Sequence, residues 1–220
     1  MGKAVLPNFS VNTLKTASDS SVIYCSFAFI SKQIPMEIMR LVVTGPVGAG
    51  KSTFIRSVSE IEVVDTDRQA TDETALLKQK TTVAFDFGRL QFGEEMALHL
   101  YGTPGQSRFD FMWDILIRKA DAYMLLVAAH RPNEFRYARR ILNFMNQRMQ
   151  IPMIVGLTHS DLPGAWSTDN VALALGYIDE RNRPPFAIVN PTETASVAQA
   201  VVTLVEHLME SYMTEEIATT

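Results

Sequence analysis

The fold is decided by the stretch Gly45-Pro46-Val47-Gly48-Ala49-Gly50-Lys51-Ser52. It fits the pattern G-x-x-x-x-G-K-[ST], which is typical of a loop that binds the phosphates of a nucleoside triphosphate. Glycines allow the backbone to fold closely around phosphate oxygens with its N–H groups pointing inward. The Lys51 ammonium can then reach the β and γ phosphates, and the Ser52 hydroxyl can ligate Mg²⁺. The predicted nucleotide contacts of the loop are Gly45, Val47, Gly48, Ala49, Gly50, Lys51, Ser52 and Thr53.

The residues on either side of the loop support this interpretation. Residues 39–44 form a short apolar run that reads as a buried strand, and residues 51–58 continue as a helix. The helix adds its positive N-terminal end to the phosphate site. Strand, glycine loop and helix form the arrangement that such a loop requires, and the alternative is a chance glycine-rich turn.

Composition narrows the class of protein. The chain has 220 residues, 47% of them hydrophobic, which suits one domain with an extension. A net charge of -4 argues against a nucleic-acid partner. The single cysteine, Cys25, excludes a disulfide framework, and no apolar run approaches the ~20 residues that span a membrane. We therefore expect a cytoplasmic protein with no integral membrane segment.

The chain divides into three predicted parts. Residues 1–37 are rich in Ser, Thr and Asn, and we interpret them as an accessory extension without a convincing signal peptide. Residues 38–213 form the predicted domain, and residues 214–220 form a C-terminal tail. Met36 or Met39 is an alternative translation start, because the first strand begins there.

Apolar runs alternate with helical patterns along the domain, which predicts an α/β fold of three layers. We expect a mostly parallel sheet of about six strands, with helices on both faces. The residues at 91–95 look like a hairpin turn, so the strands on either side are predicted to pair antiparallel. The predicted strands are 39–44, 82–90, 96–101, 122–129, 151–157 and 186–189, and the predicted helices are 51–58, 109–119, 133–149, 168–176 and 194–213.

Ligands of such sheets bind beyond the carboxyl ends of the strands. Polar and glycine-rich segments follow the predicted strands at just these points. They begin at Gly45, Thr103, His130, Thr158 and Asn190. Together with the phosphate loop, this ordered set resembles the Ras-like small GTPases of the P-loop GTPase superfamily, and within them bacterial members related to the gliding-motility GTPase MglA. The resemblance implies binding of GTP and GDP, Mg²⁺, slow hydrolysis, and a GTPase-activating or effector protein that binds the switch regions.

The segment Tyr101-Gly102-Thr103-Pro104-Gly105-Gln106 looks like the D-x-x-G-Q segment of these GTPases. By resemblance, Gly105 contacts the γ-phosphate and Gln106 orients the attacking water, which makes Gln106 and Lys51 the predicted catalytic residues. Gly102 stands where the family has an Asp that helps to hold Mg²⁺, so a weaker metal shell and slow hydrolysis are expected. The alternative is an ordinary Pro-Gly turn at the end of a strand.

The segment Thr158-His159-Ser160-Asp161 matches the family's N-K-x-D guanine motif in part. Asp161 can accept hydrogen bonds from the ring N–H and the exocyclic amine of guanine, a donor pair that adenine lacks. Thr158 replaces the usual Asn, and His159 replaces the usual Lys. The alternative is that Asp161 caps a turn before Leu162.

Two further positions follow from the resemblance. Thr82 is the predicted switch threonine that ligates Mg²⁺ together with Ser52, and Thr81 is its alternative. Asn190 and Pro191 fall where the family contacts the base through backbone N–H groups.

Three functions are compatible with these motifs. The first is a GTPase that acts as a nucleotide-dependent molecular switch. The second is a nucleotide-binding scaffold with little hydrolysis, as the residues at 102 and 158 suggest. The third is an ATP-using P-loop enzyme, although no arginine-rich lid segment is evident and Gln106 suits a water nucleophile better.

Overall fold

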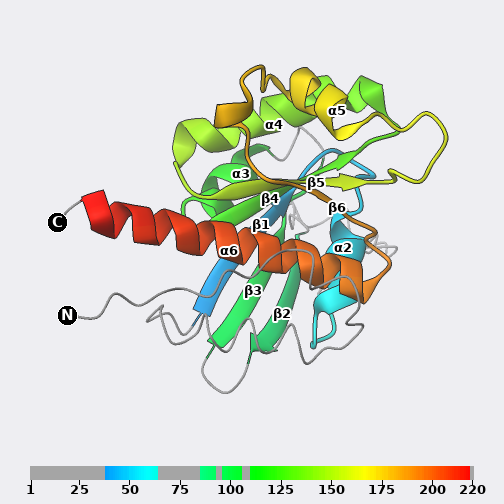
Figure 1. Cartoon of the computed structure of the whole chain (residues 1–220). Coiled ribbons are helices and arrows are strands. Elements are labelled where there is room, and N and C mark those ends of the chain that lie inside the picture. The colour runs from blue at the N-terminus through cyan, green and yellow to red at the C-terminus, as the bar shows by residue number, and fades with distance from the viewer. Residues whose placement is uncertain (1–37, 64–84, 93–95, 106–109, 219–220) are drawn as a thin grey trace.

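The computed structural model describes residues 38–63, 85–92, 96–105 and 110–218. They form a six-stranded sheet with helices packed on both of its faces (Figure 1). The strands are β1 (Ile38–Thr44), β2 (Asp86–Phe92), β3 (Met96–Gly102), β4 (Ala122–Ala128), β5 (Met153–Thr158) and β6 (Phe186–Ile188). The helices are α2 (Lys51–Val58), α3 (Asp110–Ile117), η4 (Pro132–Glu134), α4 (Phe135–Arg148), α5 (Thr168–Leu175), η5 (Glu180–Asn182) and α6 (Thr194–Ala218).

The strand order in the sheet is β2-β3-β1-β4-β5-β6. β2 and β3 pair antiparallel, and every other neighbouring pair is parallel. The predicted three-layer fold with one antiparallel strand is therefore confirmed. Residues 82–84, where the second strand was predicted to begin, and residues 93–95 of the predicted turn lie outside the described part of the chain.

Each face of the sheet has its own hydrophobic core. α2 and α6 cover one face, and α3, α4 and α5 cover the other (Figure 1). Because side chains alternate along a strand, Met124 and Leu126 of β4 enter the first core while Tyr123 and Leu125 enter the second. All residues of β4 are buried, as expected of a central strand between two helical layers.

Helix ends follow from local sequence. Pro132 opens a short 3₁₀ turn, so α4 begins at Phe135 rather than at residue 133. Ser167 caps α5 by accepting a hydrogen bond from the Asn170 N–H, and Gly176 ends the helix with φ 103°. α6 continues to Ala218, beyond the predicted end of the last helix at residue 213.

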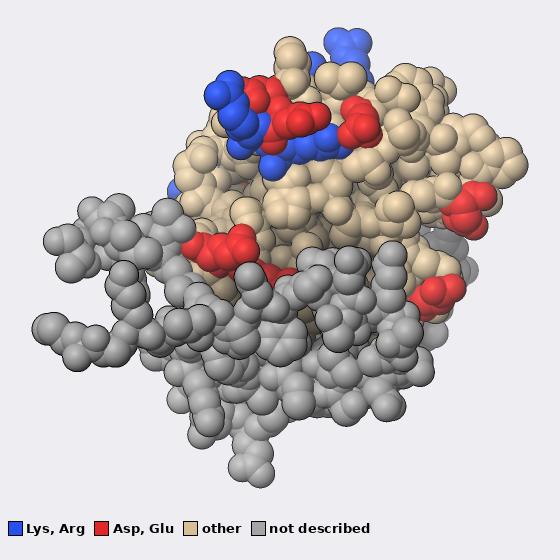
Figure 2. All heavy atoms as spheres, in the orientation of Figure 1, with Lys and Arg blue, Asp and Glu red and all other residues tan. Residues whose placement is uncertain are grey.

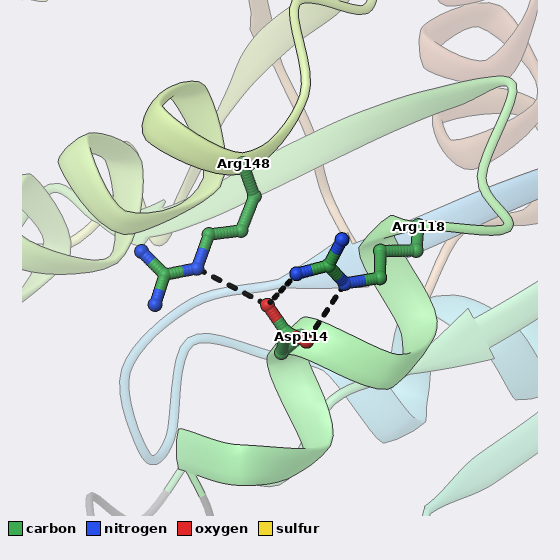
Figure 3. Close-up of polar contacts among 3 residues, drawn as sticks. All are labelled: Asp114, Arg118 and Arg148. Atoms are coloured by element: carbon green, nitrogen blue, oxygen red, sulfur yellow. Dashed lines mark hydrogen bonds and ion pairs between the residues drawn. The ribbon is translucent and has the colours of Figure 1, made fainter.

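An ion-pair cluster joins α3 to α4 on the second face (Figure 3). Asp114 of α3 accepts hydrogen bonds from Arg118, one turn later, and from Arg148 of α4. The hydrogen bond from Arg118 is the main cause of the lowered pKa of Asp114, and Arg148 adds to it. This cluster fixes α3, which follows the Gly105 loop in the sequence, against α4.

The surface carries charges of both signs. On the face drawn in Figure 2, basic and acidic side chains lie next to one another near α4 and α5 rather than forming a continuous basic area. Ion pairs of the described residues include Arg181–Asp179 and Arg183–Asp169. Across the described residues, none of the helices is both long and apolar enough to cross a membrane.

Candidate nucleotide-binding site

The phosphate loop joins the end of β1 to the start of α2, as predicted. Gly45 has φ +146°, and a Cβ at this position would lie 2.2 Å from the carbonyl oxygen of Leu126, so only glycine fits against β4. Gly50 forms the N-cap of α2 with φ +93° and supplies no capping side chain. The Gly50 position therefore offers no side-chain acceptor to the first backbone N–H groups of α2. A bound phosphate could accept hydrogen bonds from these N–H groups.

Lys51 lies beneath this loop and is only 8% exposed. Its Nζ donates hydrogen bonds to the carbonyl oxygens of Gly45 at 2.9 Å and Pro46 at 2.8 Å. Burial lowers the pKa of the Lys51 ammonium to about 8, although the nearby Asp86 carboxylate opposes this shift. A bound phosphate would supply the negative charge that this buried ammonium lacks.

The hydroxyl of Ser52 contacts a carboxylate that the sequence motifs did not include. Ser52 Oγ donates a hydrogen bond of 2.6 Å to Asp86 Oδ2. Asp86 lies on β2 directly opposite Gly102 of β3. A Cβ at Gly102 would lie 3.0 Å from the Asp86 Cβ and 2.8 Å from Ile55 Cδ1. Asp86 thus fills the space where an aspartate at 102 would extend, and the carboxylate reaches Ser52 from the neighbouring strand.

The contact of Asp86 with Ser52 could have been predicted from the sequence only by combining two features. Asp86 is an acidic residue inside an otherwise apolar alternating strand, and Gly102 lacks the aspartate of the motif that it resembles. The pairing register that brings the two residues together is set by the hairpin and is not visible in either segment alone.

Hard cations such as Mg²⁺ prefer oxygen ligands and are often held by one or two protein groups together with water and substrate phosphates. Ser52 and Asp86 offer this donor set and fit such an ion. In the part of the chain that the structure describes, no group of three or more His, Cys, Asp or Glu side chains gathers in a metal-binding cluster. Thr82, the second predicted metal ligand, lies outside that part, as does Thr81.

The segment after β3 packs against the phosphate loop. Thr103 Oγ1 donates a hydrogen bond of 2.8 Å to Thr44 Oγ1 at the end of β1. A Cβ at Gly105 would lie 2.8 Å from both Lys51 Nζ and the backbone nitrogen of Val47. Gly105 therefore packs directly against Lys51 and the backbone of the phosphate loop. Gln106, the predicted catalytic residue, is outside the described residues.

A buried tryptophan helps to hold the segment at Gly105 in place. Trp113 of α3 is fully buried and its indole N–H donates a hydrogen bond of 3.2 Å to the Pro104 carbonyl oxygen. Trp113 therefore connects the Gly105 loop to the core beneath α3. Ile115 on the same helix is 52% exposed.

The segment at the end of β5 forms the other side of the site. Thr158 is the last residue of β5, and its Oγ1 donates a hydrogen bond of 3.1 Å to the Ala49 carbonyl oxygen in the phosphate loop. The threonine thus connects the two loops. Asp161 is exposed and makes no hydrogen bond with other described residues, which does not favour the turn-capping alternative.

His159 adopts a left-handed backbone conformation with φ 56°. Its ring packs on that of His130, with 4.8 Å between the ring centroids, and its Nδ1 lies 3.0 Å from Thr158 Oγ1. Burial is the main cause of the lowered pKa of His159, and His130 and Arg131 lower it further. The ring is therefore a neutral surface beside Asp161 at neutral pH.

The other residues predicted to contact the nucleotide lie in the segment after β6, in the phosphate loop and in α2. The backbone N–H of Asn190 already donates to Ser196 Oγ at 2.9 Å, and Asn190 Oδ1 accepts from Thr192. Pro191 has no N–H, but its ring packs against Gly50, where a Cβ would lie 2.8 Å from Pro191 Cγ. Val47 is 56% exposed at the tip of the loop, and Thr53 lies half-buried in the first turn of α2.

The fold and this site define a P-loop nucleotide-binding protein. The sequence of residues 43–216 matches the model of a family described as "Conserved hypothetical ATP binding protein", and the chain belongs to that family. Among the solved structures, its fold is similar to that of the small GTPase Arl6 (BBS3) from Trypanosoma brucei with a bound nucleotide analogue, GppNp. The TM-score is 0.60 at 16% sequence identity, over 79% of this chain and 98% of that chain. No curated protein matches the sequence.

Proposed function

We propose that this protein binds GTP together with Mg²⁺, hydrolyses it slowly to GDP and acts as a nucleotide-dependent molecular switch. The observation that carries the proposal is the convergence of Lys51, the Ser52–Asp86 pair and Gly105 on one glycine loop. Lys51 would neutralise the β and γ phosphates, and Ser52 and Asp86 would hold Mg²⁺. Mg²⁺ would screen the charge of the phosphates when bound.

Hydrolysis requires a positioned water, and we assign this role to Gln106 by its place directly after Gly105. The glycine at 102 was one argument for a nucleotide-binding scaffold that does not hydrolyse. Asp86 weakens that argument, because it places a carboxylate beside Ser52. A slow rate is nevertheless expected, since Ras-type turnover without a partner is only about 10⁻⁴ per second.

Asp161 is the residue that would select guanine over adenine. Its exposed carboxylate, with no hydrogen-bond partner among the described residues, can accept from both donors of guanine. The description of the family names ATP, so adenine is the competing base. If a bound adenine covers this carboxylate, the acceptor that it leaves desolvated and unpaired would cost about 1–3 kcal/mol relative to guanine.

The switch follows from the contact between Gly105 and the loop. Gly105 packs directly against Lys51 and Val47, so a γ-phosphate held by the loop would displace it and would thereby set the position of the segment that continues into α3. A partner protein of the effector or GTPase-activating type would recognise that segment, and the resemblance to MglA-type GTPases supports this role. We expect the protein to act in the cytoplasm.

The test is calorimetric titration of the full chain with GTP, GDP and ATP, with and without Mg²⁺. We expect the tightest binding for guanine nucleotides, a dependence on Mg²⁺ for GTP, and weaker GTP binding in Asp161→Asn with a gain for xanthine nucleotides. Equal affinity for ATP and GTP would favour the ATP-using alternative, and no binding of either would reject the site.

Hydrolysis is tested separately by single-turnover release of phosphate. Gln106→Leu should release phosphate more slowly than the wild-type chain while its affinity for GTP stays the same, because the side chain orients water rather than nucleotide. A mutant as fast as the wild type would show that another group positions the water.

A further inference from the structure

One arginine lies against the phosphate loop on the side away from Asp86. Arg131 follows β4, and its guanidinium approaches Gly48, where a Cβ would lie 2.5 Å from Arg131 Nη1 and 3.4 Å from its Cζ. Gly48 has φ +76° and no side chain, so the guanidinium lies directly on the backbone of the loop. Any larger residue at position 48 would displace it.

The orientation of Arg131 is set by its neighbour. Arg131 Nε donates a hydrogen bond of 3.2 Å to His130 Nε2, and the His130 ring packs on His159. Nδ1 of His130 is buried and has no hydrogen-bond partner among the described residues. A chain of contacts therefore leads from the guanine side, at His159, to the phosphate loop at Gly48.

No carboxylate among the described residues forms an ion pair with Arg131. Described arginines that do form ion pairs include Arg118, Arg148, Arg181 and Arg183. Burial is the main cause of the lowered pKa of His159; His130 and Arg131 lower it further, and Asp161 opposes the shift. The Arg131 guanidinium contacts the His130 ring and the Gly48 backbone. Such a fork of N–H donors matches the oxygens of a phosphate.

We propose that Arg131 is a nucleotide-binding residue whose guanidinium contacts a phosphate of the nucleotide held by the loop, from the side opposite Asp86. The proposal rests on the proposed nucleotide binding and adds a cation that the loop motif does not contain. Lys51 approaches the phosphates from below the loop, whereas Arg131 approaches them from the β4 side. Arg131 lies between the His159 side of the site and the phosphate loop. Its positive charge would attract a phosphate, which the neutral ring of His159 would not.

The experiment compares Arg131→Ala, Arg131→Lys and the control Arg136→Ala by calorimetry with GTP, GDP and guanosine. Arg136 is an exposed arginine of α4, so its removal changes the net charge equally. We expect Arg131→Ala to weaken GTP and GDP binding by about 10-fold or more, as for loss of a charge-assisted hydrogen bond. Arg131→Lys should recover part of the loss, and guanosine affinity should not change. If adenine nucleotides bind better, the adenine series replaces the guanine series.

The outcomes separate this inference from the proposed function. Failure of the wild-type chain to bind any nucleotide would reject both. Wild-type binding with Arg131→Ala equal to Arg136→Ala would reject only the role of Arg131. An equal loss for guanosine and GDP would also reject phosphate contact, because the residue would then support the base side. Thermal unfolding of Arg131→Ala checks that the variant folds, and Arg131→Lys provides the measurement if it does not.

Discussion

At the scale of single residues, Lys51 carries the strongest prediction. We expect Lys51→Ala to lower the affinity for GTP and GDP by roughly 10- to 100-fold, because alanine cannot replace an ammonium that contacts phosphates. The midpoint of thermal unfolding should change little. Removing the buried charge relieves a desolvation cost, while the carbonyl groups of Gly45 and Pro46 lose their donor.

Lys119→Ala is the matched control for this change, since Lys119 is an exposed lysine near the end of α3. It should bind nucleotide as the wild type does. Equal affinity of Lys51→Ala and Lys119→Ala for GTP would contradict the phosphate loop assignment.

The lowered pKa of His159 leads to a prediction of how the stability of the fold depends on pH. The His159 pKa in the folded chain is lowered from the ordinary value of 6.5, mainly by burial and then by His130 and Arg131, while Asp161 opposes the shift. The unfolded chain therefore binds a proton at this histidine before the folded chain does as the pH falls. The free energy of unfolding should decrease as the pH drops below about 6.5. His159→Gln should make this decrease smaller.

Urea unfolding of the nucleotide-free protein at pH 7 and at pH 5.5 measures the change. The control His207→Gln removes a histidine from α6 and leaves the His130–His159 pair in place. The prediction is wrong if His159→Gln loses as much stability on acidification as the wild-type chain.

At the scale of elements, the β2–β3 hairpin brings Asp86 to the place beside Ser52. We expect Gly102→Asp alone to destabilise the fold by roughly 1–3 kcal/mol, because its Cβ would crowd Ile55 Cδ1 and its carboxylate would meet that of Asp86. Asp86→Ala alone should reduce the gain in GTP affinity that Mg²⁺ provides. Combining the two changes moves the carboxylate from β2 to β3.

The double variant should be more stable than the sum of the single changes predicts, and it should recover part of the Mg²⁺ dependence. A double-mutant cycle by urea unfolding, with GTP titration in the presence and absence of Mg²⁺, measures both effects. Additive changes in stability would show that Asp86 and Gly102 do not share one space.

The hairpin also shows what the sequence alone could not predict. The phosphate loop, α2 and the succession of strands and helices along the chain followed from local patterns, because a buried strand, a glycine loop and a helix are each visible in short windows. The positions of Asp86 and Arg131 depend on pairing register and on how one loop packs over another. These are long-range features that leave no local pattern, so both residues were missed as contacts. The role of Thr158 as a link to Ala49 was hidden in the same way.

At the scale of the whole molecule, the site is built from segments that follow β1, β3, β4 and β5, so it exists only when both halves of the sheet are assembled. Nucleotide should therefore bind the folded chain and not the unfolded one. At 100 times the dissociation constant this stabilises a protein by about 2.7 kcal/mol. For a domain of this size we expect the unfolding temperature to rise by roughly 5–10 °C with GTP and Mg²⁺.

Intrinsic fluorescence can follow this transition, because Trp113 is buried and connects the core to the Gly105 loop through the Pro104 carbonyl. Thermal scans with GTP, GDP and ATP should rank the nucleotides in the same order as calorimetry, and Lys51→Ala should show a much smaller shift at the same concentrations. If the wild-type chain binds GTP in calorimetry but its unfolding temperature does not rise at saturating nucleotide, then GTP must bind the unfolded chain equally well. That result would contradict a site assembled from strand ends that meet only in the folded sheet.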